Sequence, residues 1–257
     1  MDALTGAVPD DVPSKSMARA LALLSAAERP IALTGAGVST ESGIPDYRSG
    51  VIAWNVYDAR ARATYWKMSQ DFYVLLRQAK PNRAHQALAQ FEKLGKLKGI
   101  VTQNVDRLHQ RAGSTRVIEI HGHEFGVTCL QCGARYARDE IYKWILHGVE
   151  VPYCLHCQGF LKPDSIAFGQ PMNFETSRQA LDQADRCDLL LVAGTSLAVE
   201  PVAALVARTA ARGARLIIVN YGPTDFDATA DVLLRGSAGA ILARLAADYE
   251  SQQRWVK

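Results

Sequence analysis

Hydrophobic positions along the chain form short continuous runs that alternate with segments of helical spacing. Residues 14–27 carry apolar side chains three and four positions apart, and Pro30 ends this pattern. Runs that are apolar at every position are typical of parallel strands that are covered on both faces. The runs that predict such strands are 31–33, 99–102, 188–193 and 215–220.

Helical spacing returns between these runs. The segments that show it are 83–94, 174–186, 202–212 and 238–249. Regular alternation of strands and helices predicts an α/β fold, with a doubly wound, Rossmann-like parallel sheet. Residues 125–161 interrupt the alternation, so we expect them to form a small separate lobe.

Composition is that of an ordinary soluble globular protein, with 48% apolar and 21% charged residues among 257. The net charge, 29 − 26 = +3, is too small to indicate a surface for nucleic acid. No apolar run approaches the ~20 residues that span a bilayer, so no membrane partner is expected. The first 13 residues contain three Asp and no Lys or Arg, unlike a secretory or transit signal. We therefore expect a cytoplasmic protein with a flexible tail at residues 1–13.

Four of the five cysteines form two C-x-x-C pairs with 21 residues between them. Disulfides are rare in the cytoplasm, and redox chemistry needs only one such pair. Two knuckles of two thiolates each are typical of a tetrahedral zinc site, and four thiolates leave no position for a substrate. The predicted ligands of one structural Zn²⁺ are Cys129, Cys132, Cys154 and Cys157. His156 lies inside the second knuckle and could replace a cysteine, whereas Cys187 is expected only to pack in the core.

These observations predict the domain organisation. Residues 14–124 and 162–257 would form the Rossmann-like domain, with a helical insert at about 50–80. Residues 125–161 would form the zinc-binding lobe.

Glycine-rich or polar turns follow three of the predicted strands. Gly35-Ala36-Gly37 follows the first strand, Gly194-Thr195-Ser196 follows the run at 188–193, and Asn220 ends the run at 215–220. The third glycine of a G-x-G-x-x-G motif is missing, so the first turn alone is weak evidence. Ligands of open α/β sheets bind at the carboxyl ends of the strands. The three turns together predict a nucleotide site.

Longer motifs give the chain a resemblance to a known family. They are GAGVSTESGIPDYR at 35–48, TQNVD at 102–106, HG at 121–122, the two C-x-x-C pairs, FGQ at 168–170 and GTS at 194–196. In this order they resemble the sirtuins, the NAD-dependent protein deacylases, from about residue 31 to 236. STESGIPDYRS and LKPDSIAFG look most like the class II (sirtuin-4-like) branch and its bacterial relatives.

The resemblance implies a binding site for NAD⁺ as a consumed co-substrate. The glycine turn would hold the pyrophosphate, and the Pro-Asp-Tyr-Arg segment, with Tyr where many sirtuins have Phe, would cover the nicotinamide ribose. The TQNVD motif would line the ribose and nicotinamide pocket, and the later turns would meet the phosphate and adenosine. The residues assigned in this way are Gly35, Ala36, Gly37, Ser39, Pro45, Asp46, Tyr47, Arg48, Gln103, Asn104, Asp106, Gly194, Thr195, Ser196, Asn220, Tyr221, Gly222 and Ala238.

The resemblance also assigns catalytic roles to His121 and Asn104. A neutral imidazole suits the base, because its ordinary pKa of ~6.5 leaves it able to accept a proton near neutrality. The implied reaction removes an acyl group from lysine and gives nicotinamide and O-acyl-ADP-ribose. The other histidines, at 85, 109, 123 and 147, have no such motif and are expected to be structural.

The implied partner is an acyl-lysine protein or peptide, bound as an extended strand between residues 166–169 and 197–200. The residues assigned to it are Ile166, Phe168, Gly169 and Val199. Sirtuins that favour acyl groups with a distal carboxylate resemble one another in a Tyr-x-x-Arg pair, but here the position three after Tyr73 is Leu76, and Arg77 comes one residue late. Tyr57 and Arg60 have the right spacing but lie too close to Arg48 in the sequence. We therefore expect neutral acyl groups to be preferred over succinyl.

Two alternatives remain open at this point. The first keeps the fold and NAD but transfers ADP-ribose to protein, an activity attributed to some sirtuins. The second is a zinc-ribbon module that binds nucleic acid, which would need a basic patch around the metal. The charged side chains of residues 125–161 balance, which disfavours this second alternative. They are Arg135, Arg138 and Lys143 against Asp139, Glu140 and Glu150.

Overall fold

The computed structural model of the chain describes residues 12–46, 59–167 and 169–255. Its main element is a six-stranded sheet in the order β3-β2-β1-β7-β8-β9, and every pair of neighbouring strands is parallel. The strands are β1 Pro30–Thr34, β2 Ile100–Thr102, β3 Val117–Glu119, β7 Leu189–Ala193, β8 Arg215–Val219 and β9 Val232–Leu234. The predicted doubly wound parallel sheet is confirmed.

Strand order places the ligand-binding edge of the sheet. The chain moves outward from β1 to β3 and then returns to the other side of β1 for β7, β8 and β9. The order therefore reverses between β1 and β7, and in such sheets ligands bind at the carboxyl ends of the strands that flank this point. All five residues of β1 and of β7 are buried, as their continuous apolar sequences indicate.

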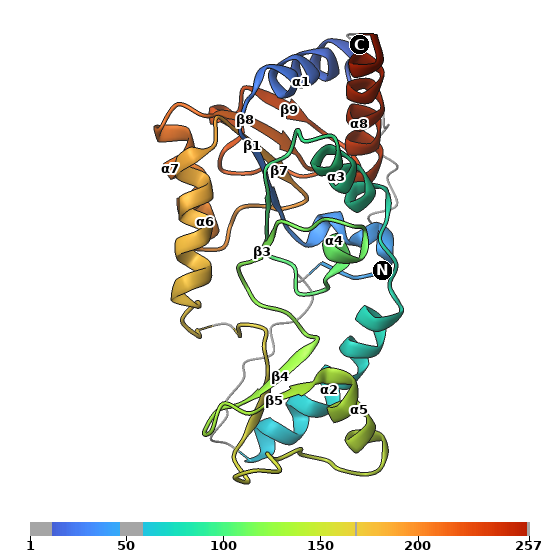
Figure 1. Cartoon of the computed structure of the whole chain (residues 1–257), viewed down its shortest axis with the longest axis vertical. Helices are drawn as coiled ribbons and strands as arrows, with labels where there is room; N and C mark the ends of the chain where they lie inside the picture. Colours follow the sequence, from blue (N-terminus) through green and yellow to red (C-terminus); the bar gives the residue numbers. More distant parts are fainter. Residues whose placement is uncertain (1–11, 47–58, 168, 256–257) are drawn as a thin grey trace, which may run out of the picture.

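Helices cover both faces of this sheet (Figure 1). On one face, α1 Ser14–Ala26, α3 Arg83–Lys93 and α8 Ala238–Trp255 share a single apolar core with the strands. On the other face, α6 Phe174–Arg186 and α7 Val202–Ala211 pack in a second core. The predicted helical segments correspond to α1, α3, α6, α7 and α8.

A second, three-stranded antiparallel sheet lies below the large sheet in Figure 1. Its strands, in the order β5-β4-β6, are β4 Gly126–Cys129, β5 Arg135–Ala137 and β6 Leu161–Pro163, and α5 Arg138–Leu146 follows β5. The long helix α2 Ala59–Gln78 packs against this sheet, because its Trp66 is buried among Val127, Cys129 and Ile141. This small lobe carries both C-x-x-C pairs.

Short elements complete the connections. They are the 3₁₀ turns η1 Ala36–Val38, η2 Thr40–Ser42 and η4 Asp227–Thr229, and the short helix α4 Leu108–Arg111. None of the helices among the described residues combines the length and the hydropathy that a membrane-spanning segment requires.

Candidate active site

The turns after β1 and β7 are in direct contact. Gly37 N donates to Gly194 O at 2.8 Å. A Cβ on Gly35 would lie 2.6 Å from Thr195 Cβ, and a Cβ on Gly37 would lie 2.8 Å from Gly194 Cα. Only glycine fits at either position, so the close packing of the two turns is itself sufficient to require the G-x-G sequence.

Most backbone amides of the first turn are already used. Gly35, Val38 and Ser39 donate to backbone carbonyls, as Gly37 does. Within the described residues, the amide of Ala36 has no acceptor. A phosphate at this turn would therefore be met by the Ala36 amide, with the glycines shaping the turn around it.

A buried polar network lies beneath the same turn. Ser39 Oγ donates to Asp106 Oδ2 at 2.6 Å, and Asn104 Nδ2 lies 3.1 Å from Gly35 O and 3.0 Å from Ser39 Oγ. Burial raises the pKa of Asp106, against the opposing effect of the Ser39 hydrogen bond. The network joins the TQNVD segment after β2 to the glycine turn, and it therefore brings Asn104 and Asp106 to the predicted site.

His121 has a fixed orientation at the end of the segment that follows β3. Its Nδ1 lies 3.1 Å from the carbonyl oxygen of Gln103, which can only accept, so Nδ1 carries the proton and Nε2 is the acceptor in the neutral ring. Desolvation lowers the pKa of His121, although the Gln103 hydrogen bond opposes it. The side chain of Gln103 donates to Thr195 Oγ1 at 3.0 Å, which links His121 to the β7 turn.

Gly122 explains why the motif is His-Gly. Its φ is +68°, in the left-handed region, and a Cβ would overlap the carbonyl oxygen of Asp164 and lie 3.0 Å from its carbonyl carbon. His121 O also accepts from Ile166 N at 2.8 Å. The segment that carries the proposed base is therefore packed directly on the segment that carries the proposed peptide-binding residues.

The remaining histidines are placed differently. Burial lowers the pKa of His85 to about 4 and the pKa of His109 well below its usual range, and their rings lie 4.8 Å apart. Burial also lowers the pKa of His123 to about 4. His147 is exposed at the end of α5, with Nδ1 2.7 Å from Lys143 O.

On the predicted adenosine side, Asn220 is 9% exposed and its Nδ2 donates to Gly222 O at 3.0 Å. Tyr221 is 59% exposed, and Ala238 is buried at the first position of α8. Ser196 is half-buried in the turn after β7.

Several predicted residues lie at or beyond the limits of the described segments. Pro45 is exposed and Asp46 is half-buried at the end of the first segment. Ile166 is half-buried, while Gly169 and Val199 are exposed. The predictions for Tyr47, Arg48 and Phe168 fall outside the described residues.

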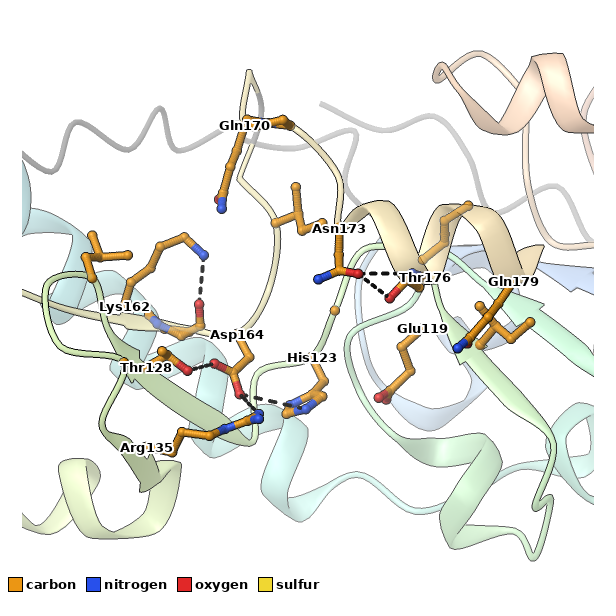
Figure 2. Close-up of a pocket in the computed structure, with 18 of the residues that line it drawn as sticks. Glu119, His123, Thr128, Arg135, Lys162, Asp164, Gln170, Asn173, Thr176 and Gln179 are labelled. Atoms are coloured by element: carbon orange, nitrogen blue, oxygen red, sulfur yellow. Dashed lines mark hydrogen bonds and ion pairs between the residues drawn. The ribbon is translucent and has the colours of Figure 1, made fainter. Parts of the chain in front are cut away.

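A cleft of about 720 Å³ separates β3 and the start of α6 from the small sheet (Figure 2). Asp164 lines this cleft on the side of the small sheet: Thr128 Oγ1 donates to it at 2.6 Å, Arg135 Nη2 lies 3.2 Å away, and His123 Nε2 lies 4.0 Å away. Sequence reasoning gave Asp164 no role, although it lies within LKPDSIAFG. Its three partners come from different elements, which no local pattern could have indicated.

The two C-x-x-C pairs meet as predicted. The four Sγ atoms lie within 4.8 Å of one another, with 3.6 Å between Cys129 and Cys157 and 3.6 Å between Cys132 and Cys154. Tetrahedral zinc with Zn–S bonds of about 2.3 Å requires Sγ–Sγ separations of about 3.8 Å. We call these residues the four-cysteine cluster, and their geometry fits one structural Zn²⁺. His156 is not among the clustered atoms of the described residues.

Comparison with known proteins places the chain in a family. Residues 35–201 match the Sir2 family. A relative from Thermodesulfovibrio yellowstonii, named NAD-dependent protein deacetylase, is 41% identical over 82% of this chain and 87% of its own length. Another from Archaeoglobus fulgidus, named NAD-dependent protein deacylase 2, is 37% identical over 88% of this chain and 93% of its own.

A solved structure of a Sir2 protein with a p53 peptide and NAD⁺ superimposes with a TM-score of 0.81 at 36% identity, covering 91% of this chain and 99% of the other. These relatives are bacterial and archaeal, in line with the expected bacterial resemblance; the sirtuin-4-like branch stays a prediction. The match over most of the chain, the shared fold and the arrangement of the site agree, and the chain belongs to the Sir2 family.

Proposed function

We propose that this protein is an NAD-dependent protein lysine deacylase that gives nicotinamide and O-acyl-ADP-ribose. The observation that carries the proposal is His121, a neutral imidazole with Nδ1 held by Gln103 O and Nε2 left to accept a proton. It stands beside the turns after β1 and β7 in a member of a family whose relatives are named NAD-dependent deacetylases and deacylases.

The site suits NAD, which when bound supplies the ribose that takes the acyl group. Ala36 offers its backbone amide to the pyrophosphate, and the two glycines let this turn pack closely against the turn after β7. Asn104 and Asp106 line the nicotinamide side of the site. The adenosine side is lined by Asn220, Tyr221, Gly222 and Ala238. We include Pro45, Asp46, Tyr47 and Arg48 in the same binding site on the strength of the family motif.

His121 acts as the general base of this reaction. Lowering of its pKa keeps the ring neutral at pH 7, so Nε2 accepts a proton from a hydroxyl placed before it. The Gln103 carbonyl fixes the tautomer and the ring orientation, and Gln103 is itself fixed by Thr195. Asn104, whose amide nitrogen is bound to Gly35 O and Ser39 Oγ, keeps the β1 turn at a constant distance from the base.

The protein substrate binds as an extended strand between residues 166–169 and 197–200. A structural neighbour holds a p53 peptide together with NAD⁺, which supports a peptide partner for this chain. Ile166 is anchored to His121 through its amide, and Val199 is 40% exposed, so the apolar side chain is open to a ligand. Main-chain pairing of this kind gives affinity with little demand on the substrate sequence. Cysteines arranged as ligands of a metal rather than as disulfides also support a cytoplasmic location, as part of this proposal.

The test combines an acyl-lysine peptide, NAD and analysis of products. Wild type should release nicotinamide and O-acyl-ADP-ribose, whereas His121→Ala and His121→Tyr should lose turnover and still bind NAD by calorimetry. His147→Ala, a histidine on the exposed end of α5, is the matched control and should turn over as wild type. Turnover of either His121 variant near the wild-type rate would refute the assigned base. ADP-ribose on protein in place of O-acyl-ADP-ribose would identify a transferase.

A further inference from the structure

An acidic side chain from the β1 side of the site lies at the start of the last helix. Glu41, in η2, accepts hydrogen bonds at Oε1 from Gly239 N at 3.2 Å and from Ser237 Oγ. Ser237 Oγ in turn accepts from Ala240 N at 3.1 Å. Arg83 Nη2 lies 3.6 Å from the other carboxylate oxygen. Glu41 is therefore held by the backbone amide of Gly239 in α8, by the hydroxyl of Ser237 directly before α8, and by the guanidinium of Arg83 in α3.

The fit between Glu41 and α8 is close. A Cβ on Gly239 would overlap both carboxylate oxygens of Glu41 and lie 2.6 Å from its Cδ. Helix N-termini favour negative charge, because their first amides have no partner within the helix. The Glu41 carboxylate thus lies where an anion would bind at the N-terminus of α8. With the carboxylate in this place, only glycine fits at position 239.

Anchoring at Glu41 fixes a segment that leads into the NAD site. Two residues earlier, Ser39 is bound to Asp106 and Asn104. Four residues later the segment reaches Pro45 and Asp46, the start of the proposed NAD-covering segment. Helix α8, on the other side of the contact, begins at Ala238, the proposed adenine contact. The Glu41 contact therefore joins the nicotinamide and adenosine sides of one site.

We propose that Glu41 is a positioning residue for NAD, which sets the spacing between the segment after β1 and the start of α8. The inference rests on the proposed function, since it requires that the site binds NAD. Its carboxylate does not touch the reacting atoms, so its loss acts on NAD affinity and leaves the chemical step intact once NAD is saturating.

The experiment measures NAD and ADP-ribose affinity by calorimetry, and kcat and KM in parallel. We expect Glu41→Ala to weaken NAD binding about tenfold, equal to about 1.4 kcal/mol, with kcat at saturating NAD within about twofold of wild type. Glu41→Gln keeps the shape and an acceptor oxygen but loses the charge, and should give an intermediate loss. Glu175→Gln is the matched control: Glu175 also lies in the first turn of a helix, α6, and its loss should leave NAD affinity unchanged.

A second variant disrupts the contact between Glu41 and α8 by a change in α8. Gly239→Ala forces Glu41 away without altering the carboxylate, and should reproduce the rise in KM for NAD. If Glu41→Ala folds poorly, Gly239→Ala and Ser237→Ala provide the same readout. A lower melting temperature with unchanged NAD affinity in these variants would reduce Glu41 to a helix cap and overturn the inference. Failure of the wild-type protein to bind NAD would instead overturn the proposed function.

Discussion

The substitution Gly122→Ala, next to the proposed base, tests whether close packing against Asp164 requires glycine beyond the strain of a left-handed backbone. A residue with a Cβ at φ +68° costs about 1–2 kcal/mol. At Gly122 the Cβ would also overlap the Asp164 carbonyl oxygen, and relief of such overpacking costs about 1–3 kcal/mol more. The expected loss is therefore about 2–5 kcal/mol of the free energy of unfolding, a large part of the stability of an ordinary domain.

Gly95→Ala is the matched control, because Gly95 has φ +73° and its Cβ would meet nothing within 4 Å. Urea denaturation measures the free energy of unfolding of both variants, and the difference between their losses is the cost of the overlap at Gly122. The control should lose only about 1–2 kcal/mol of this free energy. Relief of the overlap must also move His121 or Ile166, so kcat of Gly122→Ala should fall by about 10²-fold while Gly95→Ala keeps its rate. Equal losses of stability in the two variants, with kcat retained, would contradict the packing argument.

Three further predictions concern the metal, acid stability and the acyl group. Purified protein should carry one zinc per chain, and chelation should lower the melting temperature, because zinc-binding energy is also folding energy; folded protein without zinc would exclude the site. Stability should fall as pH drops from about 6.5 towards 4, since His85 and His123, with pKa values of about 4, stay neutral when folded but gain protons when unfolded; equal melting temperatures at pH 7 and pH 5 would contradict this. Neutral acyl peptides should give a higher kcat/KM than matched succinyl peptides, because Leu76 is fully buried and apolar whereas Arg77 points to solvent and lies 3.3 Å from Asp139; a higher succinyl value would refute it.

The sequence predicts the large sheet well because its signal is local. Continuous apolar runs at β1 and β7 correspond to strands buried at every position, and the helical segments between them fall on the observed helices. Strand β9 was not predicted, because no α-helix separates it from β8 and the alternation of strands and helices therefore gave no signal for it. The cysteine spacing was equally informative, because two knuckles of fixed geometry leave few ways to arrange four thiols.

Contacts between distant segments could not be read in this way. The glycine turn suggested backbone amides that are free to bind a phosphate. In the structure the Gly37 amide donates to Gly194 O, and packing on the turn after β7 is what requires both glycines. Glu41 gave no signal, since its partners lie almost 200 positions away at the start of α8. Local sequence indicates which residue types meet a ligand, but only the fold shows which of their atoms are already bound.

Contacts between the segment after β6 and the segment after β3 orient the base. The side chain of Asp164 is bound by Thr128 of β4 and Arg135 of β5. Its backbone carbonyl lies against Gly122, next to His121, and leaves no room for a Cβ there. Its neighbour Ser165 donates to the buried Glu124, and Ile166 donates to His121 O. Movement of the small sheet relative to the large one would therefore shift His121 against Gln103 and loosen the hydrogen bond that fixes its tautomer. A zinc ion held by the four-cysteine cluster would take no part in the chemistry, but it would fix the small sheet and thereby the position of His121. Partial loss of zinc should therefore lower kcat before the large sheet unfolds.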